Sequence, residues 1–144
     1  MHKNLLNWEG GIFKSSEETI KGGKNFSKVI SPGSVIGLHG DLGSGKTTFV
    51  KGLLNGFGFK GNVTSPTFTL VNQYDLESTL YHIDCYREPN LNSWIKLGIN
   101  DYINSDSIVI IEWYQYIESI LPNDIIKIEF KVVNFNSREI VIKK

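Results

Sequence analysis

The stretch of sequence that decides the fold is Gly40-Asp41-Leu42-Gly43-Ser44-Gly45-Lys46-Thr47. It fills every fixed position of the phosphate-binding pattern G-x-x-x-x-G-K-[ST], for which this composition gives roughly 0.02 matches by chance. Glycines let the backbone turn tightly, so that its N–H groups and the N-terminus of the following helix point at phosphate oxygens. We therefore expect Gly40–Thr48 to bind a nucleotide, with the Lys46 ammonium on the β and γ phosphates and the Thr47 hydroxyl on Mg²⁺.

Residues on both sides of this loop predict the strand and the helix between which such a loop lies. Val35–His39 is a short, mostly apolar run, which is typical of a strand buried on both faces. A helix is expected over residues 46–57, because apolar side chains recur there at helical spacing and Gly58 follows where a left-handed helix end favours glycine. The order of strand, glycine loop and helix indicates an α/β fold.

The rest of the chain predicts further strands and helices. The expected elements are a helix over 16–29, a hairpin over 67–74 and 79–86, short helices over 90–103 with a break near Gly98, a strand over 107–113, a helix over 114–120, and a second hairpin over 125–133 and 138–143. We expect a P-loop NTPase-like three-layer α/β sandwich, with a mixed, mainly parallel sheet plus antiparallel hairpins. Since the sequence has no repeat and no long linker, residues 1–144 are expected to form a single domain.

Composition narrows the function classes. Fifteen basic and fifteen acidic residues cancel, so the chain has no global field of the kind that draws proteins onto nucleic acid or anionic membranes. The single cysteine, Cys85, rules out an internal disulfide and favours a small core residue in a reducing compartment. No apolar run reaches the length of a signal sequence or a membrane span, so we expect a cytoplasmic protein without membrane contact.

Two acidic residues follow apolar runs that favour buried strands. Asp84 follows Leu80–Ile83, and Glu112 follows Ile108–Ile111. The carboxyl ends of such strands deliver side chains to the phosphate site, where a P-loop protein needs an acid near its metal. For each residue the alternative is a surface acid at a strand end.

A hydroxyl-rich stretch, residues 62–69, follows the helix after the glycine loop. Many nucleotide switches place there a loop that responds to the γ phosphate. A plain loop leading into a strand has the same composition, so the residues of this stretch leave both interpretations open.

Four motifs taken together resemble the TsaE (YjeE) family. In chain order they are Gly40-Asp41-Leu42-Gly43-Ser44-Gly45-Lys46-Thr47-Thr48, Thr64-Ser65-Pro66-Thr67-Phe68-Thr69-Leu70-Val71, His82-Ile83-Asp84-Cys85-Tyr86-Arg87 and Ile111-Glu112-Trp113. The resemblance implies a small bacterial ATPase that uses ATP and Mg²⁺ and is needed for the N6-threonylcarbamoyladenosine modification of tRNA. The family works with the TsaD and TsaB proteins, which hold the substrate, so the resemblance implies contact with tRNA only through the complex.

The resemblance also implies roles for single residues. Thr47 and Glu112 match the family's Mg²⁺ ligands, and Asp84 matches the acid beside the metal that helps to orient the attacking water. Together with Lys46, the two acids are the expected catalytic residues. Trp113 resembles the family's aromatic neighbour of the metal acid, and packing in the core is the alternative for it.

The remaining implied nucleotide contacts come from separate parts of the chain. Thr64 and Thr67 lie in the stretch that is similar to the family's switch loop. Ser16, Thr19 and Arg138 lie where the family encloses the adenine. All five are therefore expected to bind the nucleotide.

Other nucleotide-binding classes fit the sequence less well. A small-molecule kinase would need several arginines around the transferred phosphate, whereas this chain has only Arg87 and Arg138. A GTPase would need a guanine-reading N-K-x-D motif, which the sequence lacks. A nucleotide-dependent adaptor with negligible hydrolysis of its own stays open, because so short a chain has little material with which to close its site against water. The expectation is an ATPase that is weak alone and is stimulated by partner proteins.

Overall fold

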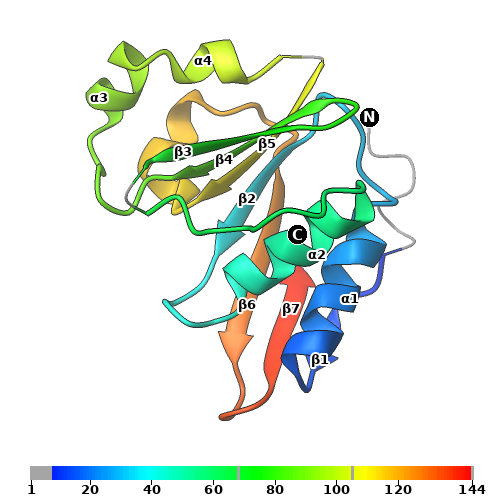
Figure 1. Ribbon diagram of the computed structural model, residues 1–144. Coiled ribbons are helices and arrows are strands. Elements are labelled where there is room, and N and C mark those ends of the chain that lie inside the picture. Colours follow the sequence, from blue (N-terminus) through cyan, green and yellow to red (C-terminus); the bar gives the residue numbers. More distant parts are fainter. Residues whose placement is uncertain (1–7, 68, 105, 144) are drawn as a thin grey trace. The chain divides into compact units, whose positions relative to one another are not determined.

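The computed structural model describes residues 8–67, 69–104 and 106–143, and they form a mixed α/β fold with seven strands (Figure 1). By its internal contacts the chain divides into two compact units that alternate along the sequence. The first unit contains residues up to 31, 40–64 and from 128 onward, and the second contains 32–39 and 65–127. The expectation of one domain over 1–144 stays a prediction. No helix within the described ranges is long and apolar enough to cross a membrane.

The second unit is built on four strands, β2 (Val35–His39), β5 (Ser107–Glu112), β4 (Thr79–Asp84) and β3 (Val71–Asp75), which lie side by side in that order. β2 and β4 are both parallel to β5, whereas β3 pairs antiparallel with β4 as the predicted hairpin. All six residues of β5 are buried, as expected for a strand that has a neighbour on each side. The carboxyl ends of β4 and β5 therefore lie next to each other.

Side chains alternate between the two faces of these strands, and one face carries an apolar cluster. Val35, Ile83, Val109 and Ile111 lie on it and pack against the short helices of the unit. Those helices are α3 (Leu91–Lys96), α4 (Ile99–Tyr102) and the 3₁₀ helix η2 (Tyr114–Ile120). Polar side chains at the ends of β4 and β5 belong to the opposite face, which leaves the apolar face to hold the unit together.

Cys85 belongs to this apolar cluster, as the sequence predicted. Its side chain is completely buried. Burial, helped by the negative charge of Asp84, raises the pKa of the Cys85 thiol to about 12. A thiol with this pKa is almost entirely protonated at neutral pH, so Cys85 is a packing residue rather than a nucleophile.

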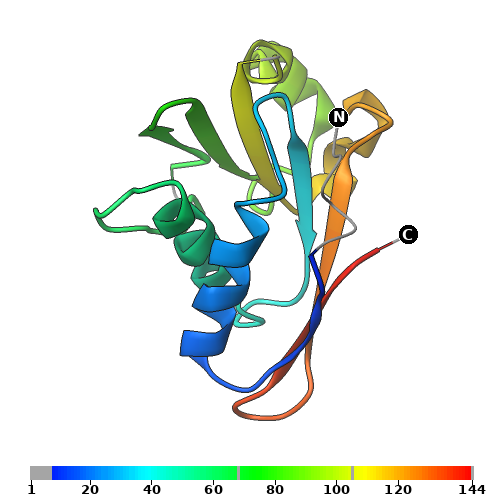
Figure 2. The same ribbon diagram turned by 90° about the vertical axis from the view of Figure 1, so that its right-hand side faces the viewer.

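The first unit contains two helices, α1 (Ser16–Phe26) and α2 (Lys46–Gly56), which lie side by side in both views (Figures 1 and 2). It also contains most of an antiparallel meander in which β7 (Arg138–Ile142) pairs with β1 (Gly11–Phe13) and with β6 (Ile126–Val132). Aromatic side chains from α1, α2 and β6 meet in its core, where Phe49 contacts Phe26 and Phe130 at ring-centroid distances of 5.7 and 5.5 Å.

Glycines bring the backbones of α1 and α2 into direct contact. A Cβ added at Gly23 would fall on the carbonyl oxygen of Phe49, and one added at Gly52 would fall on the carbonyl oxygen of Ile20. Glycine weakens a helix by itself, but here it lets the axes approach closely. Because α2 begins at the glycine loop, this packing fixes the helix that carries Lys46 and Thr47.

Most predicted elements are confirmed, including β2, α2, both hairpins and the break at Gly98, whose φ is +80°. Three further features differ more clearly from the prediction. β3 begins at Val71 rather than Thr67, because Leu70 adopts a φ of +67° and its N–H donates to the Pro66 carbonyl at 2.7 Å. α1 ends at Phe26 instead of continuing to 29, and Ser27 Oγ donates to the Lys24 carbonyl there at 2.6 Å. Residues 114–120 form a 3₁₀ helix with a kink at Ile117.

We predict that Gly23→Ala destabilises the protein although alanine is the better helix former. Alanine would favour the helix by about 1 kcal/mol, but its methyl group would collide with the Phe49 carbonyl, and such overpacking costs about 1–3 kcal/mol. We expect a net loss of up to about 2 kcal/mol in the free energy of unfolding, measured by urea denaturation. Lys24→Ala, at an exposed position of the same helix, is the control. A Gly23→Ala protein more stable than wild type would contradict the close packing of α1 and α2.

Candidate functional site

The glycine loop of the first unit has a backbone conformation that depends on its glycines. Gly43 and Gly45 have φ values of +78° and +103°, in the left-handed region that side chains other than glycine rarely adopt. A Cβ at Gly40 would lie 2.8 Å from the carbonyl oxygen of Phe130 and 2.7 Å from Ser44 Oγ. Each glycine of the motif therefore has its own steric reason, as the sequence predicted.

The start of α2 and the adjoining Ser44 present hydrogen-bond donors. The helix has no side-chain cap and no acidic residue in its first turn, and its first backbone bond runs from Phe49 N to Gly45 O at 2.9 Å. The N–H groups before Phe49 consequently lack partners within the helix. Ser44 Oγ is buried and has no hydrogen-bond partner among the described residues. These donors and the positive end of the helix fit an anion such as a phosphate group.

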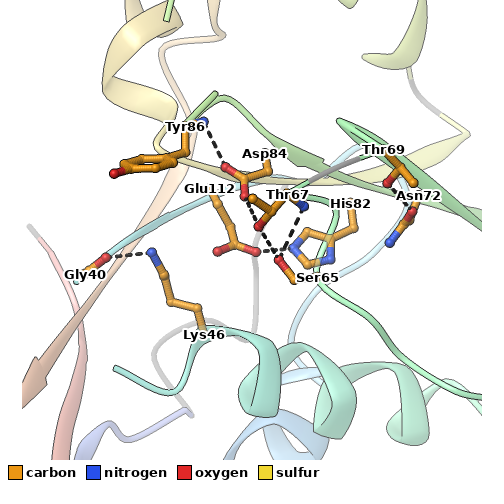
Figure 3. A network of polar contacts seen from close by, with 10 residues as sticks. All are labelled: Gly40, Lys46, Ser65, Thr67, Thr69, Asn72, His82, Asp84, Tyr86 and Glu112. Carbon is orange, nitrogen blue, oxygen red and sulfur yellow. Dashed lines mark hydrogen bonds and ion pairs between the residues drawn. The ribbon is translucent and has the colours of Figure 1, made fainter. Parts of the chain in front are cut away.

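The charged member of the loop is Lys46, the first residue of α2. Its side chain is 5% exposed, and Nζ donates to the Gly40 carbonyl at 2.6 Å (Figure 3). Thr47 and Thr48 follow on the first helical turn and are half-buried, whereas Asp41 and Leu42 are exposed. Lys46 thus already reaches over the loop whose backbone would hold the phosphates.

Three residues expected at the adenine lie in the same unit but differ in their contacts. Arg138, on β7, lies against the loop, since a Cβ at Gly45 would fall 2.6 Å from its Nη1. Arg138 Nε is buried without a hydrogen-bond partner in the described part of the chain. Thr19 is completely buried, and its hydroxyl donates to the Ser15 carbonyl at 3.1 Å, so it holds the start of α1. Ser16 is exposed, and the adenine assignment of the three stays a prediction.

The second unit brings the two predicted acids together. In the parallel pairing of β4 and β5, Asp84 lies opposite Glu112, so both carboxylates point to the same face at the carboxyl ends of their strands. Each residue is 4% exposed. The alternative of two unrelated surface acids is therefore wrong.

Asp84 is held by hydrogen bonds on both carboxylate oxygens (Figure 3). Tyr86 N donates to Oδ1 at 2.9 Å, and Thr67 Oγ1 donates to Oδ2 at 3.0 Å. Thr67 Oγ1 also lies 2.7 Å from Ser65 Oγ, and Asp84 N donates to the Leu70 carbonyl at 2.9 Å. The stretch proposed as a switch loop is thus bonded to the acid that it would serve, although exposed Thr64 lies in the other unit.

Glu112 has a partner that the sequence analysis did not identify. His82 Nε2 lies 2.6 Å from Glu112 Oε2, and the His82 side chain is completely buried (Figure 3). The available signal was the two-residue spacing of His82 and Asp84, which places both side chains on the same face of β4.

Trp113 lies beside Glu112 at the edge of the apolar cluster. Its backbone has a φ of +57°, and its ring contacts Tyr86 and Tyr116 at centroid distances of 5.0 and 6.0 Å. Since the two tyrosines are 42% and 39% exposed, Trp113 belongs to a partly exposed aromatic cluster. It both neighbours the acid and packs against the core, so the two interpretations of the sequence are compatible.

The donor types of these residues decide which cation would fit. In the described part of the chain, no group of three or more His, Cys, Asp or Glu residues could hold a metal ion by itself. Mg²⁺ is usually held by one or two carboxylates together with phosphate oxygens and waters rather than by such a cage. Within the second unit, the carboxylates of Asp84 and Glu112 are oxygen donors, a type that suits Mg²⁺ better than a softer metal.

Comparison with known proteins agrees with this arrangement. Residues 13–140 match the sequence model of the family described as threonylcarbamoyl adenosine biosynthesis protein TsaE. The chain belongs to the TsaE family. It is 36% identical to the tRNA threonylcarbamoyladenosine biosynthesis protein TsaE of Treponema pallidum, over 91% of this chain and 97% of that protein. It is 39% identical to the protein of the same name from Bacillus subtilis, over 86% of this chain and 78% of that protein.

A solved structure supports the same TsaE-type fold. The crystal structure of Bacillus subtilis YdiB superimposes with a TM-score of 0.79 and 34% sequence identity, covering 93% of this chain and 83% of YdiB. The predicted family and the predicted α/β fold class are therefore both confirmed.

We predict that Thr67→Val destabilises this TsaE-family protein, because valine has the shape of threonine but donates no hydrogen bond. Asp84 Oδ2 would then lose its hydrogen-bond donor, although Asp84 is only 4% exposed. Leaving such an acceptor unpaired costs about 1–3 kcal/mol, which urea denaturation would measure. Thr67→Ser keeps the hydroxyl and should stay within about 1 kcal/mol of wild type. Equal stability of the Val and Ser variants would show that the bond to Asp84 contributes nothing.

Proposed function

We propose that this chain is an ATP-binding, Mg²⁺-dependent ATPase that serves the N6-threonylcarbamoyladenosine modification of tRNA and is stimulated by TsaB and TsaD. The observation that carries the proposal is the glycine loop, in which two left-handed glycines, buried Lys46 and the uncapped start of α2 form an anion site. Membership of the TsaE family supports the choice of pathway. The proposal places the protein in the cytoplasm.

The loop would bind the phosphates by charge and by backbone donors. Lys46 Nζ, now 2.6 Å from the Gly40 carbonyl, would turn its ammonium to the β and γ phosphates. The N–H groups at the start of α2 and Ser44 Oγ would donate to phosphate oxygens, which supplies their missing partners. The backbone donors at the start of α2 need no rearrangement for this, and donors that are already in position interact strongly with developing or bound charge.

The acids would serve the metal and the water. When bound, Mg²⁺ would neutralise charge on the β and γ phosphates. We assign Thr47 and Glu112 as its protein ligands, with Asp84 beside it as the acid that orients the attacking water. Asp84 and Glu112 stand opposite each other at the carboxyl ends of the neighbouring parallel strands β4 and β5. This placement supports the proposal that both carboxylates act on one phosphate group.

The contacts of Asp84 support dependence on partners. Both of its oxygens accept hydrogen bonds, from Tyr86 N and Thr67 Oγ1, which compete with binding and orienting a water molecule. Rearrangement of the loop that carries Thr67 would free the carboxylate, and docking of TsaB and TsaD is the proposed cause. The same observation favours the alternative of a nucleotide-dependent adaptor with negligible hydrolysis of its own. No comparable observation favours a small-molecule kinase.

We predict that Lys46→Ala abolishes tight ATP binding. The substitution removes the buried ammonium that would neutralise the β and γ phosphates. Calorimetric titration with a non-hydrolysable ATP analogue and Mg²⁺ should show a loss of affinity of at least about 100-fold, the size of a lost charge-assisted contact. Lys51→Ala, on an exposed position of α2, is the matched control and should bind like wild type. Unchanged affinity of Lys46→Ala would remove the phosphate-loop assignment.

We predict that a strain lacking this chain loses threonylcarbamoyladenosine from its tRNA, whereas the isolated protein binds tRNA poorly. The net charge of zero gives too few unopposed Lys and Arg side chains to release many phosphate counterions. Nucleoside analysis of total tRNA, with the wild-type gene restored as control, tests the first part. A filter-binding titration at physiological salt tests the second. Normal modification in the deletion strain would refute the pathway, and submicromolar tRNA binding would refute recognition through partners alone.

A further inference from the structure

The strongest contact that the proposed roles leave unused is the bond between His82 and Glu112. The pairing register places His82 opposite Ile110, so Glu112 is its diagonal neighbour across β4 and β5. His82 and Glu112 are 0% and 4% exposed, and the Nε2 to Oε2 distance is 2.6 Å (Figure 3). The bond therefore involves one oxygen of the carboxylate that is assigned to the metal.

The direction of this hydrogen bond follows from the chemistry of the two groups when the carboxylate is ionised. An ionised carboxylate only accepts hydrogen bonds, so His82 Nε2–H is the donor and Glu112 Oε2 the acceptor. A neutral imidazole then carries its lone pair on Nδ1, which has no hydrogen-bond partner in the described ranges. The contact thus holds one tautomer of the ring against one oxygen of the carboxylate.

Stability is a poor reason for this pair. On the same face, the neighbouring positions of β2 and β5 are apolar, among them Ile36, Leu38 and Ile110. The free-energy cost of removing a charged carboxylate from water can exceed what its buried partner returns, and apolar side chains of similar volume are often at least as stabilising in such places. A buried Nδ1 without a partner adds to that cost. The pair therefore suggests a requirement set by the function of Glu112.

We propose that His82 is a positioning residue that orients the Glu112 carboxylate for its cation. This inference rests on the proposed role of Glu112 as a Mg²⁺ ligand. The terminal torsion of a glutamate side chain has a broad energy minimum, so the carboxylate plane is not fixed by rotamer preference. The rigid imidazole on β4 fixes it by a short bond to Oε2. Mg²⁺ needs near-ideal octahedral geometry, which makes its affinity sensitive to the orientation of each ligand.

The test measures cation binding rather than turnover. His82→Met fills the space without a donor, whereas His82→Gln restores an N–H the same number of bonds from Cβ as Nε2. Calorimetry with the non-hydrolysable ATP analogue AMPPNP gives the nucleotide affinity in EDTA and at stepped Mg²⁺ concentrations. We expect His82→Met to raise the half-saturating Mg²⁺ concentration by about 10- to 100-fold. Its affinity in EDTA should stay within about twofold of wild type, since the phosphate loop is unchanged.

Two further variants separate the possible causes. Ile83 follows His82 in β4, but its side chain packs in the apolar cluster on the other face. Ile83→Ala should therefore lower the stability without changing Glu112, and it should keep the wild-type Mg²⁺ midpoint. Glu112→Gln should raise that midpoint at least as much as His82→Met. Recovery of most of the Mg²⁺ affinity in His82→Gln would support positioning by the N–H donor.

Other outcomes would overturn the inference. A wild-type midpoint in His82→Met with a raised midpoint in Glu112→Gln would refute positioning and leave the metal role intact. If Glu112→Gln also kept the wild-type midpoint, the proposed metal role itself would be wrong. If His82→Met does not fold, a His82→Gln midpoint as high as that of Glu112→Gln would count against the inference, as would an equal shift in Ile83→Ala.

Discussion

The pairing of the two acids depends on the parallel register between β4 and β5. That register places Asp84 opposite Glu112 and His82 diagonal to it, so the three polar groups share one face of the two strands. A slip of β4 by one residue would turn His82 and Asp84 to the face of Val109 and Ile111, away from Glu112. The apolar cluster therefore fixes the register, and the register fixes which carboxylates can act together.

The glycine loop depends on a different constraint, the absence of side chains. Gly43 and Gly45 allow the left-handed backbone of the loop, while Gly40 allows the chain to pass close to Phe130. Gly23 and Gly52 then let α1 support α2, the helix that begins with Lys46. Glycine thus acts twice, once in the shape of the loop and once in the packing of the helix that follows it.

Short sequence patterns predicted the elements whose structure depends on neighbouring residues. The motif identified the loop, and apolar periodicity located β5 and α2, because those signals lie within a few consecutive residues. Features set by distant contacts were missed. The three-residue strand β1 exists through its pairing with β7, and the start of β3 is delayed by the turn that ends at Leu70. The partnership of His82 with Glu112 joins positions 30 residues apart, so the spacing of one strand indicated only half of it.

ATP turnover by the purified chain, alone and after addition of TsaB and TsaD with Mg²⁺ present, tests the proposed function most directly. Asp84 is engaged by Thr67 and Tyr86, so the account predicts slow hydrolysis by the isolated protein. It predicts a rise of at least about tenfold when both partners are added, corresponding to about 1.4 kcal/mol of barrier. The rise should disappear in Asp84→Asn while nucleotide binding persists. Equal turnover with and without the partners would contradict a partner-stimulated ATPase.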